Sequence, residues 1–324
     1  MNSLYKFAGT FLLIVTPLLA LSQSNSEYPN RPIKLIVPQA AGGGLDQVAR
    51  LMLPKLSENL GQAVIIDNRG SAGGIAGIDI AAKASPDGYT LLMASATVAL
   101  NTALGMKLPY DAERDFAPIS LAVTIPLMVV THPSVPYKNL KDIVEESKKV
   151  TGGLPIAIAS IGTLPHLLAE AMRFKSQANL NLIFYKGSAP ASLDALSGTV
   201  PIFIDSIGPI ATHVAANKFH PIALTSKVRS PLFPQVPTVV EQGFPDLVGS
   251  AFYGFLSPAK TPIAIQKRIN QAVAATLSNP EIREKLLKQG YEIFGGPPEE
   301  YASFMKNEIS RWSQIVKAAN IKVE

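Results

Sequence analysis

The sequence predicts an α/β protein made of two domains. At 324 residues the chain is longer than one ordinary hydrophobic core supports, and it fits two domains of average size. Short runs rich in β-branched and apolar residues alternate with segments whose apolar residues recur at helical spacing. Strands that alternate with helices are typical of parallel sheets covered on both faces. We therefore expect two series of βα units, one in each domain.

The first twenty-two residues are predicted to be a secretory signal peptide. Lys6 is the only charged residue before an apolar run, Phe7 to Leu21, that ends in Ala20-Leu21-Ser22. Such an order is typical of signals for export. The run is shorter than the about 20 apolar residues that span a bilayer, so a retained anchor is the weaker alternative. No cysteine follows it, which excludes a lipid-anchored lipoprotein. We expect cleavage near Ser22 and an exported, soluble, periplasmic protein.

Nine strands are predicted after this leader, most of them separated by a helical segment. The first helix ends at Gly61 and is expected to kink at Pro54. The strands are predicted at Ile33–Pro38, Ala63–Asn68, Tyr89–Ser95, Leu127–Thr131, Leu154–Ser160, Asn181–Tyr185, Val200–Asp205, His220–Thr225 and Phe252–Ser257. Three helices close the chain, at Pro262–Leu277, Pro280–Gln289 and Glu299–Ala319.

The chain is predicted to cross between its domains twice. It passes from one βα series into the second around Ala117 to Pro126, and it returns after a proline-rich stretch around Pro231 to Pro245. Residues 23–125 and 250–324 would form a discontinuous domain 1, and residues 126–249 would form domain 2. Two crossing strands, near Thr124–Pro126 and Gly249–Ala251, are therefore expected to act as a hinge.

Composition and motifs exclude several classes of function. The net charge of +5, from 29 Lys+Arg and 24 Asp+Glu, comes without a basic cluster, so we expect no nucleic-acid partner. No cysteine is present to act as a nucleophile or metal ligand. The four histidines lack metal-ligand spacing, and neither H-E-x-x-H nor G-x-S-x-G occurs. We expect no metal, no cofactor and no catalytic residue, hence no enzyme.

A glycine-rich turn between the first strand and the first helix is the first candidate binding element. Glycines permit close backbone approach, and the unpaired amides that open a helix attract an anion such as a carboxylate. The turn lacks the third glycine of a dinucleotide motif and the G-K-[ST] ending of a P-loop. The alternative to a binding role is that the turn only connects the strand to the helix. For Asp46, the alternative to ligand contact is that it caps the helix. The candidate residues are Gln39, Ala40, Ala41, Gly42, Gly43, Gly44 and Asp46.

A second turn of the same type follows the strand that ends at Ser160. Thr163 suits an N-cap, and Pro165 suits the first helical turn. His166 is the more ambiguous member, because a histidine in a first helical turn is often bonded locally. Two such turns facing each other would hold the two ends of a dianion. The candidates are Ser160, Gly162, Thr163 and His166, with Tyr185, Lys186 and Gly187 from a third strand end, where Lys186 is equally well a solvated charge.

In these segments the chain resembles the tripartite tricarboxylate transporter substrate-receptor family, the Bug proteins of the TctC type. The resemblance runs nearly end to end. It is carried by Tyr28–Ile33, Ala41–Arg50, Asp67–Gly74, Pro86–Leu91, Tyr110-Asp111, Asp115–Pro118, Gly162-Thr163, His166-Leu167, Tyr185–Gly187, Gly198, Pro237-Thr238, Gly243 and Tyr253-Gly254.

The resemblance implies a two-domain periplasmic-binding-protein fold, the type II Venus flytrap, hinged on two crossing strands. It also implies a small di- or tricarboxylate, amino acid or aromatic acid as ligand, held between the turns by backbone groups and ordered waters. By position it adds Ser95, Ala96, Thr97 and Asp205 to the candidates above. The family usually has an aromatic residue where this chain has Gln39, which puts the family's apolar wall in doubt.

Three functions remain after the resemblance. A receptor that delivers its ligand to an integral membrane permease is the first, and a ligand sensor for a two-component sensor kinase is the second. An enzyme acting on a carboxylate, with Asp46 and Asp205 as acid and base, is the remote third. For each of these we expect a monomer.

Overall fold

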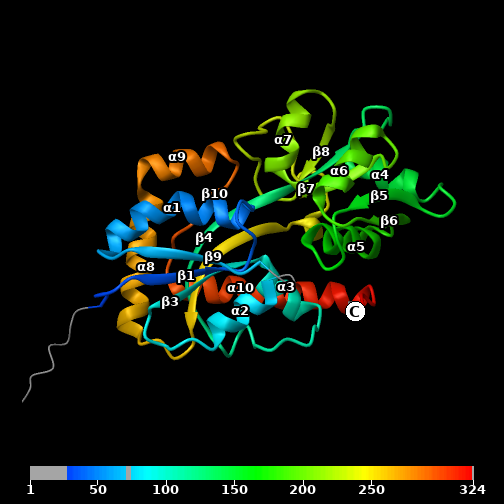
Figure 1. Cartoon of the computed structure of the whole chain (residues 1–324). Helices are drawn as coiled ribbons and strands as arrows, with labels where there is room; N and C mark the ends of the chain where they lie inside the picture. The colour runs from blue at the N-terminus through cyan, green and yellow to red at the C-terminus, as the bar shows by residue number, and fades with distance from the viewer. Residues whose placement is uncertain (1–27, 71–73, 323–324) are drawn as a thin grey trace, which may run out of the picture.

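The computed structural model describes residues 28–70 and 74–322, so the predicted signal peptide lies outside the described residues. Figure 1 shows two lobes side by side, lobe 1 with the blue, orange and red segments and lobe 2 in green. Within the described part of the chain, no helix is both long and apolar enough to cross a membrane. The strands follow one another in the order β2-β1-β3-β9-β4-β7-β5-β6, with β8 and β10 also paired to β4.

Lobe 1 is built on the parallel strands β2, β1 and β3, continued by antiparallel pairing of β3 with β9. Buried residues alternate between two clusters along β1, with Ile36 in one and Leu35 and Val37 in the other, so helices cover both faces. The elements are β1 (Ile33–Val37), α1 (Gly44–Leu60), β2 (Val64–Asn68), α2 (Ile75–Ala82), β3 (Thr90–Ser95), α3 (Ala96–Ala103), α8 (Ile263–Ser278), α9 (Pro280–Lys288), β10 (Glu292–Ile293) and α10 (Pro298–Ala318).

Lobe 2 repeats the same plan in the middle of the chain. Strand β5 lies between β6 and β7, and both pairings are parallel. The elements are α4 (Leu140–Ser147), β5 (Leu154–Ile158), α5 (Leu164–Ser176), β6 (Leu180–Phe184), α6 (Ser188–Ser197), β7 (Ile202–Ser206), α7 (Ile207–Ala215), β8 (His220–Leu224) and the short 3-10 helix η2 (Pro245–Leu247).

Two antiparallel strands, β4 (Phe116–Thr131) and β9 (Ser250–Pro258), join the lobes. Strand β4 pairs with β9 as far as Pro126, and from Leu127 onward it pairs with β7 and β8 of lobe 2. The sequence predicted a strand at Leu127–Thr131 and a crossing strand near Thr124–Pro126. Instead one sixteen-residue strand belongs to both lobes. The two-domain α/β fold is as predicted, but its sheet is mixed because the joining strands run antiparallel.

Thr225 ties the two joining strands together where they enter lobe 2. Its hydroxyl accepts the backbone N–H of Leu127 at 2.8 Å and donates to the carbonyl of Gly249 at 2.5 Å. Its carbonyl accepts the N–H of Gly249 at 2.8 Å. Thr225 is buried, so these groups have exchanged water for one another. Thr225 of lobe 2 thus connects both joining strands at the crossing point.

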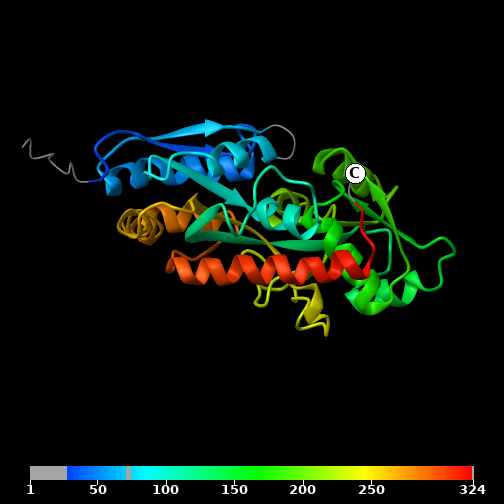
Figure 2. The ribbon, with the colours of Figure 1, turned by 90° about the horizontal axis from the view of Figure 1, so that it is seen from below.

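Two long helices frame lobe 1. Helix α1 is assigned without interruption through Pro54, whose side chain is exposed, so any kink there does not break the helix. Helix α10, red in Figure 2, runs along the underside of the molecule and contacts α3 and β4 in lobe 1 and α5 in lobe 2. Its fully buried Trp312 lies against Gly249 of the crossing, where a Cβ atom would come within 3.2 Å of the indole.

Candidate functional site

Both predicted turns border one cleft of about 500 Å³ between the lobes. Leu127 of β4 and Ala251 of β9 line it too, so the crossing strands contribute to its wall. The predicted residues that line the cleft are Gln39, Ser95, Ala96, Thr97, Ser160, Gly162, Thr163 and Asp205. The predicted residues that do not line it are Ala40, Ala41, Gly42, Gly43, Gly44, Asp46, His166, Tyr185, Lys186 and Gly187.

The first turn is closed by hydrogen bonds from behind. Gly42 adopts a φ of 85°, in the left-handed region that favours glycine, and its N–H donates to Asp46 Oδ2 at 2.8 Å. Gln39 folds back so that its Oε1 accepts the N–H of Leu45, in the first turn of α1, at 2.9 Å. Of the turn's residues, only Gln39 reaches the cleft.

Asp46 supports the first turn in this structure and does not line the cleft. Its side chain is 1% exposed. Its carboxylate also accepts from Arg50 Nε at 2.8 Å and from Asn68 Nδ2 at 2.9 Å. Burial alone would raise the pKa of Asp46, but the hydrogen bonds from Arg50, Gly42 and Asn68 outweigh it and lower the pKa below 3.8. The structure therefore favours the structural alternative to ligand contact.

The second turn is built in the same way. Gly162 has a φ of 76°, and its N–H donates to His166 Nδ1 at 3.0 Å. Because Nδ1 accepts, the proton of the neutral ring is on Nε2, which lies 3.7 Å from Glu170 Oε1. The Thr163 hydroxyl donates to the carbonyl of Ser160 at 2.7 Å instead of capping α5. His166 is buried behind the turn, so the local role weighed for it is the one observed.

The third strand end contributes indirectly. Tyr185 donates its hydroxyl to Asp194 at 2.7 Å, and Lys186 is exposed outside the cleft. In the same segment, Ser188 donates its hydroxyl to Asp205, which does line the cleft. The segment therefore supports Asp205 from behind.

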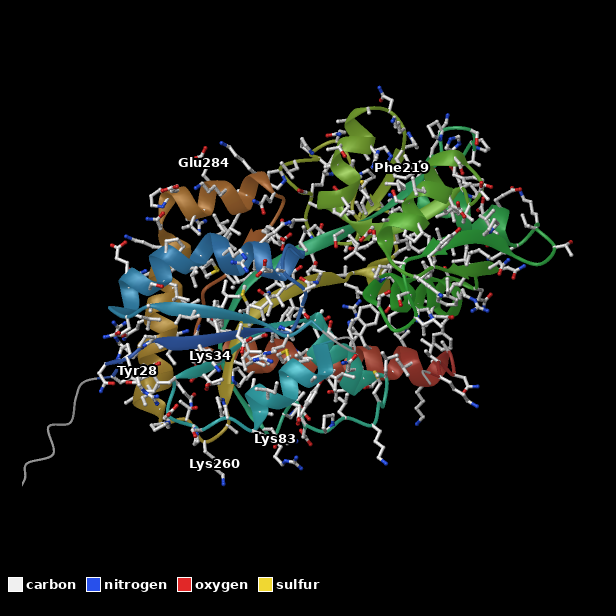
Figure 3. All side chains as sticks on the ribbon, in the orientation of Figure 1. Tyr28, Lys34, Lys83, Phe219, Lys260 and Glu284 are labelled. Carbon is white, nitrogen blue, oxygen red and sulfur yellow. The ribbon has the colours of Figure 1, made fainter. Side chains whose placement is uncertain are left out.

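Asp205 is the one Asp, Glu, Lys, Arg or His among the cleft-lining residues that the structure describes. It is 9% exposed and also accepts the N–H of Ser206 at 2.7 Å. Burial raises the pKa of Asp205, and the hydrogen bonds from Ser188 and Ser206 offset this only in part. In Figure 3 the labelled Lys83 and Lys260 project from the outer surface of lobe 1. The described residues that line the cleft therefore include neutral hydrogen-bond donors and a single acidic side chain, Asp205.

The apolar wall of the cleft was missed by sequence reasoning. Its residues come from helices α2, α3 and α5, from the loops after α3 and before α5, and from strands β4 and β9. Tyr253 also lines the cleft, and its hydroxyl would lie 2.9 Å from a Cβ atom at Gly44, so that glycine allows a close approach. The further lining residues are Ile75, Leu100, Asn101, Leu104, Met106, Leu127, Ile161, Leu164, Pro165, Ser206 and Ala251.

Comparison with known proteins identifies relatives over most of the chain. The family model described as "tripartite tricarboxylate transporter family receptor" matches residues 48–321. Protein BugT of Bordetella pertussis is 33% identical, and the match covers 100% of each chain. The solved structure of R. palustris Rpa4515 with adipate is 29% identical with a TM-score of 0.79, covering 91% of this chain and 99% of that one. MatC from Rhodopseudomonas palustris with bound malate is 29% identical with a TM-score of 0.75, covering 89% and 100%.

Proposed function

Because the chain belongs to the tripartite tricarboxylate transporter receptor family, we propose that it captures a small dicarboxylate in the cleft between its lobes. The family consists of periplasmic solute receptors and not of enzymes, so the expectation of a non-enzyme is confirmed. The observation that carries the proposal is the cleft itself, bordered by both glycine turns and lined without Lys, Arg or His among the described residues.

Neutral donors suit the recognition of a carboxylate that must later be released. The second turn lines the cleft at the start of α5, where unpaired amides and the helix dipole favour negative charge. The hydroxyls of Ser95, Thr97 and Ser160 add donors that cost less to desolvate than a charged group. A buried lysine or arginine would bind an anion more strongly but would itself have to be desolvated. The apolar wall then accommodates the carbon skeleton of the ligand.

Two relatives support a dicarboxylate in particular. Rpa4515 was solved with adipate and MatC with malate, and both ligands have a carboxylate at each end. In this chain the polar groups also lie at two sides of the cleft, Gln39 on lobe 1 and Ser160 to Thr163 on lobe 2. A ligand with two acidic ends would connect the lobes.

Closure of the lobes completes the proposal. We take residues 23–125 with 250–324 as one moving unit and residues 126–249 as the other, since β4 changes partners at Pro126 and Leu127. A dicarboxylate bound to both lobes would favour the closed state by its differential affinity. The closed receptor would deliver its ligand to a membrane permease, as the family description of a transporter receptor implies.

Ligand screening tests the proposal. We expect dicarboxylates to raise Tm and to bind at one per chain in calorimetry, because a ligand at one hundred times its Kd stabilises by about 2.7 kcal/mol. The matching diamides, which have the same skeleton without charge, are the ligand control and should give no shift. A Tm increase with sugars, peptides or metal ions but with no acid would refute the proposed function.

A matched pair of glycine variants locates the site. Gly162 lines the cleft with a φ of 76°, whereas Gly152, in a turn of the same lobe, has a φ of 84° and would present an added Cβ atom to open space, with no neighbour within 4 Å. Alanine at either position costs about 1–2 kcal/mol of backbone strain. We expect only Gly162→Ala to lose acid binding. Equal binding by both variants would place the ligand elsewhere.

A further inference from the structure

We propose that Gln39 is the group through which lobe 1 binds the ligand, and that its amide limits the cleft to short dicarboxylates. The inference rests on the proposed function and names the ligand subclass more narrowly. Gln39 is the only residue of the first turn that lines the cleft. The ligand therefore meets this side chain before it meets the turn's backbone.

The Gln39 side chain lies flat against the turn. Its Oε1 accepts the N–H of Leu45 at 2.9 Å, which uses an amide at the opening of α1. A Cβ atom at Gly43 would collide with Oε1 and come within 2.5 Å of Cδ, so the carboxamide occupies the space directly above that glycine. Any other residue at position 43 would push the amide away.

The orientation of the amide follows from this hydrogen bond. A carboxamide has its acceptor on one side and its NH2 group on the other. Because a backbone N–H is the donor to Gln39, its oxygen must face the helix, and the NH2 group points elsewhere. Within residues 28–70 and 74–322, Nε2 donates no hydrogen bond. Two N–H donors are thus left for a ligand.

Gln39 therefore passes the donor character of the helix terminus on to the cleft. The N-terminus of α1 polarises the Gln39 carboxamide through the hydrogen bond from the Leu45 N–H. A ligand carboxylate then binds Gln39 Nε2 instead of the backbone amides of the helix. The anion consequently lies farther from the helix by about one hydrogen-bond length, roughly 3 Å. That distance corresponds to roughly two or three carbon–carbon bonds of an extended chain. The wild-type cleft should accordingly favour shorter diacids.

The test compares straight-chain dicarboxylates from malonate to adipate by calorimetry. Gln39→Ala opens the helix terminus to the ligand, so the ratio of long-chain to short-chain affinity should rise at least tenfold. Gln39→Glu keeps an acceptor for Leu45 but replaces the N–H donors with negative charge, so every diacid should lose at least tenfold in affinity. Thermal unfolding shows that the variants fold.

Gln47→Ala is the matched control. Gln47 donates its amide to the carbonyl of Gly42 at 2.9 Å, so it contacts the same turn, but it lies outside the cleft. We expect the Gln47→Ala variant to have the same preference for dicarboxylate chain length as the wild type. The inference is overturned if Gln39→Ala strengthens all lengths equally, if Gln39→Glu binds as well as the wild type, or if Gln47→Ala shows the same length shift. Wild-type protein that binds no acid would overturn the proposed function itself.

Discussion

Asp46 and His166 hold equivalent positions in the two lobes. Each lies four residues after a glycine of positive φ, and each accepts the N–H of that glycine. Each is buried in the first turn of a helix that follows a strand. A carboxylate in one lobe and an imidazole in the other thus support their turns from behind. Both turns are shaped by the protein before a ligand arrives, which reduces the cost of ordering them on binding.

The first prediction concerns Asp46→Asn. An asparagine has one acceptor oxygen, so it cannot accept from Gly42, Arg50 and Asn68 as the carboxylate does. We expect the free energy of unfolding to fall by about 1–3 kcal/mol in urea titrations. Because Asp46 lies behind the turn, a plain diacid and its α-amino analogue should be weakened to the same extent. Loss confined to the amino acid would instead put Asp46 in contact with ligand.

A second prediction follows from the pKa of Asp46. The pKa is lower in the folded protein than its ordinary value of 3.8. The stabilisation by this carboxylate is therefore complete above the unfolded pKa and is lost as the pH falls through the folded pKa. As the pH falls from the unfolded pKa to the folded pKa of Asp46, the unfolding free energy of the wild type should decrease more steeply than that of Asp46→Asn. Parallel curves of unfolding free energy against pH for the two proteins would contradict the assignment.

Thr225→Val tests the crossing point. Valine has nearly the same shape but leaves the buried N–H of Leu127 without its acceptor and the carbonyl of Gly249 without the hydroxyl donor. We expect a loss of about 1–3 kcal/mol in unfolding free energy. Thr199→Val, at an exposed position whose hydroxyl pairs with that of Ser197, should change the unfolding free energy by no more than about 0.5 kcal/mol. A similar loss of unfolding free energy in both variants would show that the Thr225 hydroxyl does not stabilise the crossing of the two strands.

Trp312 should report closure through its fluorescence. It is the one tryptophan of the sequence, and it lies against Gly249 at the crossing. Its indole N–H donates to Glu308 at 2.8 Å, and the Arg311 guanidinium lies 4.3 Å above its ring. If the hinge moves relative to α10, ligand should change the emission and lower the radius of gyration together. Small-angle scattering without change at saturating ligand would argue against closure.

The sequence predicted most of what depends on local patterns. Glycine between a strand and a helix identified both turns, since a positive φ at Gly42 and Gly162 is a local requirement. The family, the two-domain fold and the role of receptor were likewise anticipated and are confirmed. The length of β4 was not predicted, because its two prolines are accommodated at special places: Pro118 lies beside a register shift in the pairing with β9, and Pro126 lies where the partner changes from β9 to β7. Gln39 was predicted as a site residue and does line the cleft, but its hydrogen bond to the N–H of Leu45 was not predicted. That bond, and the choice between ligand contact and a structural role for Asp46, depend on side-chain directions that a sequence pattern does not contain.

The last prediction uses Asp205 to separate plain acids from amino acids. The pKa of this buried carboxyl is raised above 3.8, so the folded protein loses stability as pH rises between the unfolded and the folded pKa. Asp205→Asn, whose amide can still accept from Ser206 and donate to Ser188, should recover that loss at neutral pH. In calorimetry the variant should bind plain diacids about tenfold more tightly, because a like charge has gone from a weakly solvated site. An acid with an ammonium group should instead bind more weakly, since it loses its counter-charge. If plain acids bind the variant less well, Asp205 must donate a proton to them in the wild type, and the repulsion argument would be wrong.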